Sequence, residues 1–185
     1  EELADNVELP VQVTIASGFP KGDKLEFITQ KVTELGASQI WAFPADWSVA
    51  KWDGKKLGKK VEKLEKIALG AAEQSKRNLV PSITLFEKKA DFLDQLEQFD
   101  RIVVAYEESA KEGEAAALLQ SLTGLEAGSK LLFIFGPEGG LSPAEIESFT
   151  AKGAVLAGLG PRILRAETAP LYALSAVSVV TELMN

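Results

Sequence analysis

Hydrophobic residues follow two spacings along this chain, and each spacing predicts a different kind of element. Val11, Val13 and Ile15 alternate with polar residues, which indicates a half-buried strand. Residues 131–135 are five consecutive apolar positions, a pattern typical of a strand buried on both faces. Short apolar runs predict further strands at 40–43, 83–86, 101–106 and 154–159.

Between these runs, apolar residues recur every three or four positions and predict helices. The stripe at 25–35 predicts one helix, and Asp23 and Glu26 predict its capping box. A second capping box is expected from Ser142 and Glu145. The other predicted helices lie within 51–77, at 90–98, at 112–122, from 143 to about 152, and from Thr168 to the C-terminus.

Strands and helices alternate from one end of the chain to the other. This alternation predicts an α/β fold with a mainly parallel sheet covered by helices on both faces. The length suits one core, and no linker or internal repeat divides it, so residues 1–185 are expected to form a single domain.

Composition removes several classes of chemistry. The chain has no Cys and no His, which excludes disulfides, Ser-His-Asp catalysis and most zinc sites, so no metal is expected. Any acid–base group must be Asp, Glu, Lys or Tyr. No apolar run approaches the length of a membrane span, and the acidic first residues do not resemble a signal peptide. We therefore expect a cytoplasmic protein without a membrane partner.

The charge is unevenly distributed. The formal net charge of −7 argues mildly against non-specific nucleic-acid binding, yet residues 51–66 carry seven lysines against three acidic residues. Lys55, Lys59 and Lys63 fall on the outer face of the predicted helix. They form either a solvated helix face or a patch that contacts phosphates.

A glycine-rich corner, Gly136-Pro137-Glu138-Gly139-Gly140, follows the buried strand and precedes the helix capped by Ser142. Ligands of open α/β sheets bind at the carboxyl ends of strands, and glycines let the backbone approach a ligand closely. The corner lacks the signatures of a P-loop and of GxGxxG. A tight strand-to-helix turn is the alternative explanation.

A second glycine corner at 158–160 leads into a charged cluster. Thr168 is a natural N-cap for the last helix, and Glu167 is favoured there by the helix dipole. Arg165 has no such explanation, because a cation near a helix N-terminus needs an anionic partner or substrate. Pairing with Glu167 or Glu138 is the alternative to a functional role.

The two corners together carry a family resemblance. GPEGGLSPAEIE and LGPRILRAETA resemble motifs of the RsmE family of SPOUT-class RNA methyltransferases. The resemblance extends over residues 8–182 and includes GFPKGDKLEFITQKVTELGA, SVAKWD and AAEQSKRNLVP. Family members usually begin with a PUA-like RNA-binding barrel, which this chain is expected to lack, and an Arg is expected where Trp47 stands.

The resemblance implies a C-terminal trefoil knot, a homodimer, and S-adenosylmethionine as cofactor. The implied reaction is methylation of N3 of a specific uridine in 16S rRNA of the 30S ribosomal subunit. Carried over by motif, the cofactor-binding residues would be Tyr106, Gly136, Pro137, Glu138, Gly139, Leu159, Gly160, Ile163, Leu164, Arg165, Thr168 and Ala169.

Methylation at N3 requires the uracil ring to lose a proton, and a nearby cation would stabilise the resulting anion. Arg165 is the candidate for that role, and Glu138 and Glu167 are candidate bases beside solvent. Substrate RNA is expected to contact Gln74, Ser75 and Arg77, together with Lys55, Lys59 and Lys63.

Two other functions stay open at this point. One is a catalytically idle RNA- or ribosome-binding module that retains a relic pocket. The other is a nucleotide-binding α/β enzyme of unrelated chemistry. Binding of S-adenosylmethionine, followed by a methyl-transfer assay, would separate the three.

Overall fold

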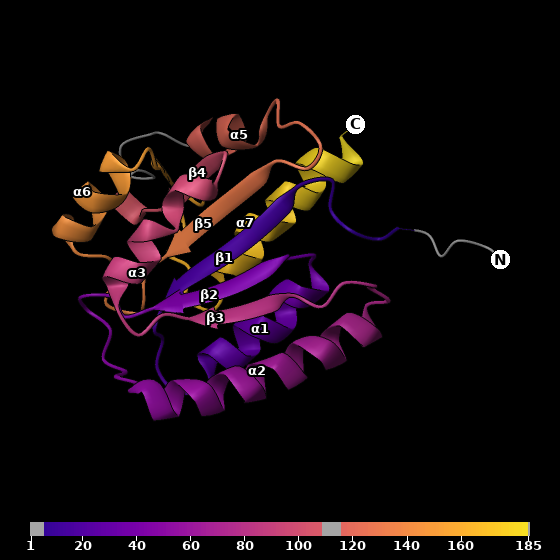
Figure 1. The fold of residues 1–185 in the computed structure, drawn as a ribbon. Coiled ribbons are helices and arrows are strands. Elements are labelled where there is room, and N and C mark those ends of the chain that lie inside the picture. The colour runs from indigo at the N-terminus through magenta and orange to yellow at the C-terminus, as the bar shows by residue number, and fades with distance from the viewer. Residues whose placement is uncertain (1–5, 109–115, 185) are drawn as a thin grey trace.

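Six strands form one parallel sheet in the order β3-β2-β1-β5-β4-β6, which confirms the predicted α/β fold (Figure 1). The computed structural model describes residues 6–108 and 116–184. The strands are β1 (Gln12–Gly18), β2 (Gln39–Phe43), β3 (Ser82–Leu85), β4 (Arg101–Ala105), β5 (Lys130–Phe135) and β6 (Val155–Ala157).

Helices connect the strands and cover both faces of the sheet (Figure 1). They are α1 (Lys24–Glu34), α2 (Gly54–Gln74), α3 (Lys89–Asp94), the 3-10 turn η1 (Leu96–Gln98), α5 (Ala116–Leu122), α6 (Pro143–Ala151), α7 (Ala169–Ser178) and the π-helical turn η2 (Val179–Leu183). The start of the helix expected at 112–122 lies outside the described residues.

The core has two main layers, one on each face of the sheet. Side chains of α1, α5 and α7 pack on one face, around Phe133 and Phe135 of β5. Side chains of α3 and α6 pack on the other face, where Phe43 stacks on Phe92 with ring centroids 4.3 Å apart. A smaller cluster seats α2 against α1 through Leu64 and Leu25. Burial of β5 on both faces explains its continuous apolar sequence.

The helix ends agree only partly with the predicted caps. Ser142 and Glu145 form the expected capping box at the start of α6. The capping box predicted at the start of α1 does not form, because Asp23 makes no side-chain cap bond. Oε1 of Glu26 instead lies 3.5 Å from Nζ of Lys60. Thr168 also makes no side-chain cap bond, since its backbone is already helical.

Within 6–108 and 116–184, no helix is long and apolar enough to cross a membrane. Over the same ranges, no cluster of acidic side chains is arranged to hold a metal ion. The trefoil knot implied by the family resemblance stays a prediction.

Candidate functional site

A cavity of about 640 Å³ opens at the carboxyl ends of the strands. Three loops supply most of its wall: 105–108 after β4, 135–141 after β5 and 159–166 after β6. Because β5, β4 and β6 are neighbours in the sheet, loops far apart in the sequence meet at one edge. This is the position at which open α/β sheets bind ligands.

The first glycine corner needs its glycines for close backbone packing. A Cβ on Gly136 would lie 2.9 Å from the carbonyl carbon of Gly140 and 3.0 Å from the amide nitrogen of Leu141. A Cβ on Gly139 would lie 3.2 Å from both the Cβ and the carbonyl oxygen of Trp47. The corner therefore folds tightly on itself and touches the loop that follows β2.

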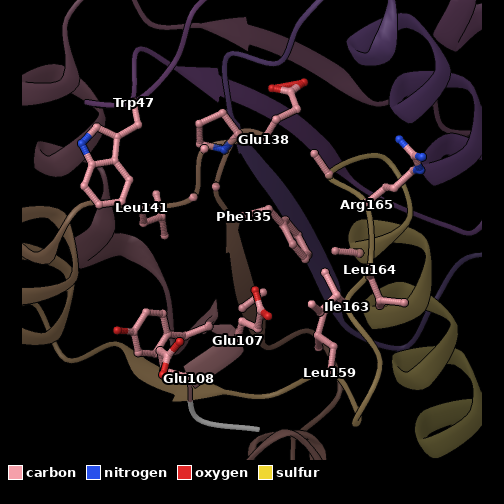
Figure 2. A pocket seen from close by; sticks show the side chains of 18 of the residues that line it. Trp47, Glu107, Glu108, Phe135, Glu138, Leu141, Leu159, Ile163, Leu164 and Arg165 are labelled. Atoms are coloured by element: carbon pink, nitrogen blue, oxygen red, sulfur yellow. The ribbon is translucent and has the colours of Figure 1, made fainter. Parts of the chain in front are cut away.

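Apolar and charged side chains surround the cavity on different sides (Figure 2). Leu159, Ile163 and Leu164 lie together on one side, while Trp47 and Leu141 lie on the opposite side. Ile163 is 78% exposed, so the apolar wall extends to the rim. Such an apolar wall with a few convergent polar groups is typical of small-molecule sites.

Glu138 is held by the start of α1. Its Oε1 accepts hydrogen bonds from the backbone N–H of Lys21 at 2.8 Å and from Nζ of Lys24 at 3.1 Å. Partial burial would raise the pKa of this carboxyl, but the hydrogen bonds from Lys21, its own amide and Lys24 outweigh it and lower the pKa. Glu138 is therefore a carboxylate with a low pKa and correspondingly low basicity.

Arg165 lies at the rim of the cavity, and Figure 2 shows its guanidinium directed outward. It is exposed, and no carboxylate among the described residues lies within ion-pair distance of it, so the alternative explanation, pairing with Glu138 or Glu167, is wrong. Lys24 instead forms ion pairs with both Glu138 and Glu167, and its Nζ lies 3.7 Å from Glu167 Oε2. Glu167 lines an adjoining groove rather than the cavity.

Of the twelve residues predicted to bind cofactor, eleven line the cavity, and Thr168 does not. Sequence reasoning did not select Lys24, Phe135, Leu141 or Trp47 as cavity residues. Lys24 and Trp47 follow β1 and β2, so only the strand order, which the sequence pattern leaves open, brings them to this edge.

The residues predicted to contact RNA are placed very differently from one another. Lys55 and Lys59 are exposed on α2, and Lys63 is exposed with Nζ 3.9 Å from Glu26. Gln74 is exposed at the end of α2. Ser75 donates its hydroxyl to the carbonyl of Ala71 at 2.8 Å, which is a local helix-end contact.

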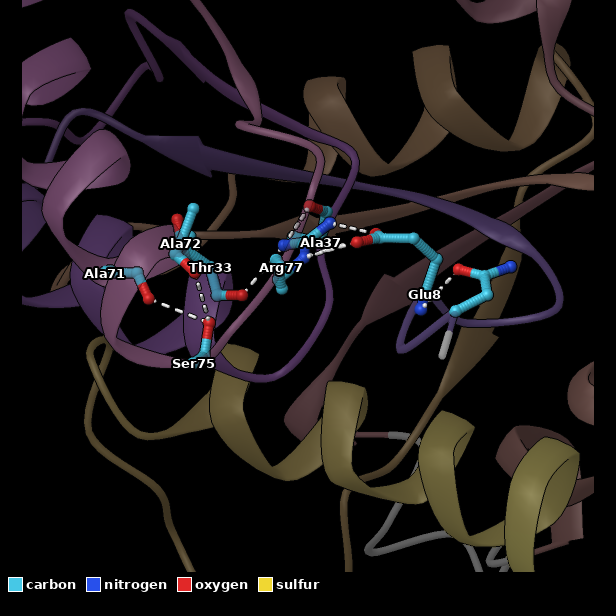
Figure 3. Close-up of polar contacts among 8 residues, drawn as sticks. Glu8, Thr33, Ala37, Ala71, Ala72, Ser75 and Arg77 are labelled. Atoms are coloured by element: carbon cyan, nitrogen blue, oxygen red, sulfur yellow. Dashed lines mark hydrogen bonds and ion pairs between the residues drawn. The ribbon is translucent and has the colours of Figure 1, made fainter. Parts of the chain in front are cut away.

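Arg77 is buried, and its side chain points into the protein (Figure 3). Nη1 donates to the carbonyls of Thr33 and Ala37 at 2.8 and 2.9 Å. Nη2 and Nε donate to Glu8, at 2.5 and 3.2 Å. The guanidinium therefore caps the end of α1 and pairs with Glu8, a structural role that directs it into the protein rather than to solvent.

Comparisons with known proteins identify the family of this chain. Residues 7–178 match the RNA methyltransferase domain family. Ribosomal RNA small subunit methyltransferase E of Bacillus subtilis is 56% identical over 181 residues, which cover 98% of this chain and 71% of that protein. The Mycobacterium bovis protein of the same name is 32% identical, over 91% of this chain and 63% of its own length.

One similar solved structure is a ribosomal RNA small subunit methyltransferase E from Neisseria gonorrhoeae bound to S-adenosyl methionine. It is 27% identical, with a TM-score of 0.79 over 96% of this chain and 70% of that chain. Because the sequence match extends over nearly all of its length and the fold is shared, the chain belongs to the ribosomal RNA small subunit methyltransferase E family of RNA methyltransferases.

Proposed function

We propose that this protein transfers a methyl group from S-adenosylmethionine to N3 of a uridine in 16S rRNA of the small ribosomal subunit. The names of the Bacillus and Mycobacterium relatives support the rRNA substrate, and the Neisseria structure supports the cofactor. The observation that carries the proposal is the cavity formed by both glycine corners, with Arg165 at its rim and without an ion-pair partner in 6–108 or 116–184.

The cavity residues fit this cofactor. Gly136 and Gly139 leave no space for a Cβ, so the backbone of the corner forms the surface that a ligand meets. Leu159, Ile163 and Leu164 offer an apolar wall for the adenosyl group. When bound, S-adenosylmethionine supplies the electrophilic methyl group.

Arg165 is the proposed stabiliser of the negative charge that forms on uracil when N3 loses its proton. Its exposed guanidinium lies where RNA arriving from solvent would meet the rim. Neither candidate base is well placed, because Glu138 has a lowered pKa and Glu167 lies outside the cavity. We therefore expect the proton to leave to water at the open mouth.

Replacing Arg165 tests this assignment. Arg165→Met should lower the rate of methyl transfer to 30S subunits about 10²-fold or more in single-turnover assays, as does loss of one charge-stabilising donor. The affinity for S-adenosylmethionine, measured by calorimetry, should change little. Arg162→Met is the matched control, since Arg162 is also exposed and lines the cavity.

A wild-type rate in Arg165→Met would remove Arg165 from the mechanism. Failure of the wild-type protein to bind S-adenosylmethionine would contradict the proposed function itself. Binding without methyl transfer to 30S subunits would favour the idle ribosome-binding module.

The proposal extends to assembly and location. We infer that residues 1–185 act as one methyltransferase domain, in a cytoplasmic homodimer that modifies the 30S subunit. An apolar face supports the homodimer: Tyr172, Val179 and Leu183 are exposed at helical spacing on α7 and η2, with Leu183 75% exposed. Sedimentation equilibrium measures the expected dimer.

A further inference from the structure

The loop between β2 and α2 presents a tryptophan to the cavity. Trp47 lines the cavity, yet its side chain is 50% exposed. It lies beside Leu141, opposite the wall of Leu159, Ile163 and Leu164 that is proposed to hold the cofactor (Figure 2). A large aromatic surface thus remains open to solvent on the side of the cavity opposite the apolar wall that is proposed for the adenosyl group.

The backbone beside Trp47 is fixed by a polar cluster formed by Asp46, Lys89, Ser142 and Glu145. The N–H of Asp46 donates to Oε2 of Glu145 at 3.1 Å, and Glu145 is only 1% exposed. The carboxylate of Asp46 accepts hydrogen bonds from Lys89 and from the hydroxyl of Ser142. Lys89 also donates to Glu145 at 3.2 Å.

This cluster joins the loop to the start of α6 and the start of α3. The hydrogen bonds from Lys89 and Ser142 lower the pKa of the Asp46 carboxyl, so this carboxylate stays charged at neutral pH. On the other side, the Cβ and carbonyl of Trp47 pack closely against Gly139, where an added Cβ would lie 3.2 Å from both. The backbone that carries the indole is therefore held in place by these contacts.

An exposed aromatic ring on a fixed loop at the mouth of a cavity is suited to stacking a planar group. Single-stranded RNA is recognised chiefly by stacking of unstacked bases on aromatic side chains, and a base must leave its helix to reach an enclosed reaction centre. Little conformational entropy is lost on binding when the ring is already ordered.

We propose that the indole of Trp47 is the stacking platform for the target pyrimidine base, which enters the cavity between Trp47 and the cofactor side. This rests on the proposed function for the identity of the base. Trp47 thereby contributes to recognition of RNA rather than to binding of S-adenosylmethionine.

Three variants test the platform. Trp47→Leu keeps an apolar side chain but removes the ring, and should raise the KM for 30S subunits about tenfold. Trp47→Phe keeps a ring and should stay within about threefold of wild type. Phe27→Leu is the matched control, because Phe27 is 44% exposed on α1 and does not line the cavity.

Calorimetry with S-adenosylmethionine and sedimentation equilibrium accompany the kinetics, and both should be unchanged in Trp47→Leu. An unchanged KM in Trp47→Leu would overturn the platform while leaving the proposed function intact. A loss of S-adenosylmethionine affinity would assign the indole to the cofactor, and a loss of self-association would assign it to a protein interface.

A binding assay separates the platform from catalysis. A short single-stranded uridine oligonucleotide should quench tryptophan emission of the wild-type protein and much less that of Trp47→Phe. If the wild-type protein neither methylates 30S subunits nor shows this quenching, both proposals fail. Quenching without methylation would overturn the proposed function and support the platform.

Discussion

Glu138 illustrates how neighbouring groups decide what one residue can do. Its position in a glycine corner suggests a catalytic base, yet Lys21 and Lys24 hold its carboxylate with hydrogen bonds and lower its pKa. A carboxyl with a lowered pKa gives up its charge only at low pH, so it joins the corner to the start of α1 more readily than it accepts a proton.

Glu138→Gln should make stability less sensitive to acid. The pKa of Glu138 is lower in the folded protein, so its contribution is present above the unfolded pKa of about 4.3 and is lost as pH falls through the folded value. Urea unfolding between pH 6 and pH 3 should show a smaller loss of free energy in the variant than in wild type.

Glu147→Gln is the control for this measurement, since Glu147 is exposed on α6 and forms no ion pair with any residue in 6–108 or 116–184. An identical acid dependence of wild type and Glu138→Gln would show that the contacts with Lys21 and Lys24 contribute nothing to folding.

At the scale of the element, the residues that follow α2 cap the end of α1. Lys76 adopts a left-handed conformation with φ 64°, and the N–H of Arg77 then bonds back to the carbonyl of Ala72 at 2.8 Å. This reversal directs Arg77 toward the carbonyl of Thr33, which also accepts from the N–H of Gly36 at 3.1 Å, and toward that of Ala37 just beyond α1. Two helices and the segment before β1 are joined by one guanidinium.

Arg77→Met should destabilise the fold by about 3 kcal/mol, because it leaves Glu8 without its cation and removes a donor from the carbonyls of Thr33 and Ala37. Urea unfolding measures the change. Lys76→Met, which removes an exposed charge at the adjacent position, should stay within about 0.5 kcal/mol of wild type.

Kinetic measurements distinguish a structural role of Arg77 from a direct contact with RNA. The KM for 30S subunits should be unchanged in folded Arg77→Met protein. A raised KM with normal stability would instead support the direct RNA contact that the sequence motif suggests.

For the whole molecule, the sequence predicted the strands better than their order. Among the described residues, alternation of apolar and polar positions identified β1, and short apolar runs identified the other five strands. The order depends on where each crossover returns, and no local pattern shows that β5 lies between β1 and β4. For the same reason, the sequence did not predict that Trp47 lines the cavity. It also did not predict the structural role of Arg77, whose partner Glu8 is 69 residues away.

The acidic molecule also carries a local basic surface on α2. Lys55, Lys59 and Lys63 lie on its exposed side although the net charge is −7. If this side contacts phosphates, changing all three lysines to Gln should make the fall of log K, the RNA-binding constant, with log salt concentration less steep by about 2.

Filter binding of 16S rRNA fragments over a range of salt concentrations measures that slope. The control is the triple Gln variant of Lys31, Lys130 and Lys152, which changes the net charge equally outside α2. Equal slopes in the two triple variants would mean that α2 presents a solvated face only.

The order in which the chain builds its cavity has a consequence for synthesis of the protein. The last wall, 159–166, follows the edge strand β6 and precedes α7, which packs against β5 and α1. A nascent chain emerging from the ribosome therefore completes its strands β1 to β5 well before any site exists. The protein becomes able to bind a ligand only after α7 has been released and has docked, so unfinished chains stay inactive.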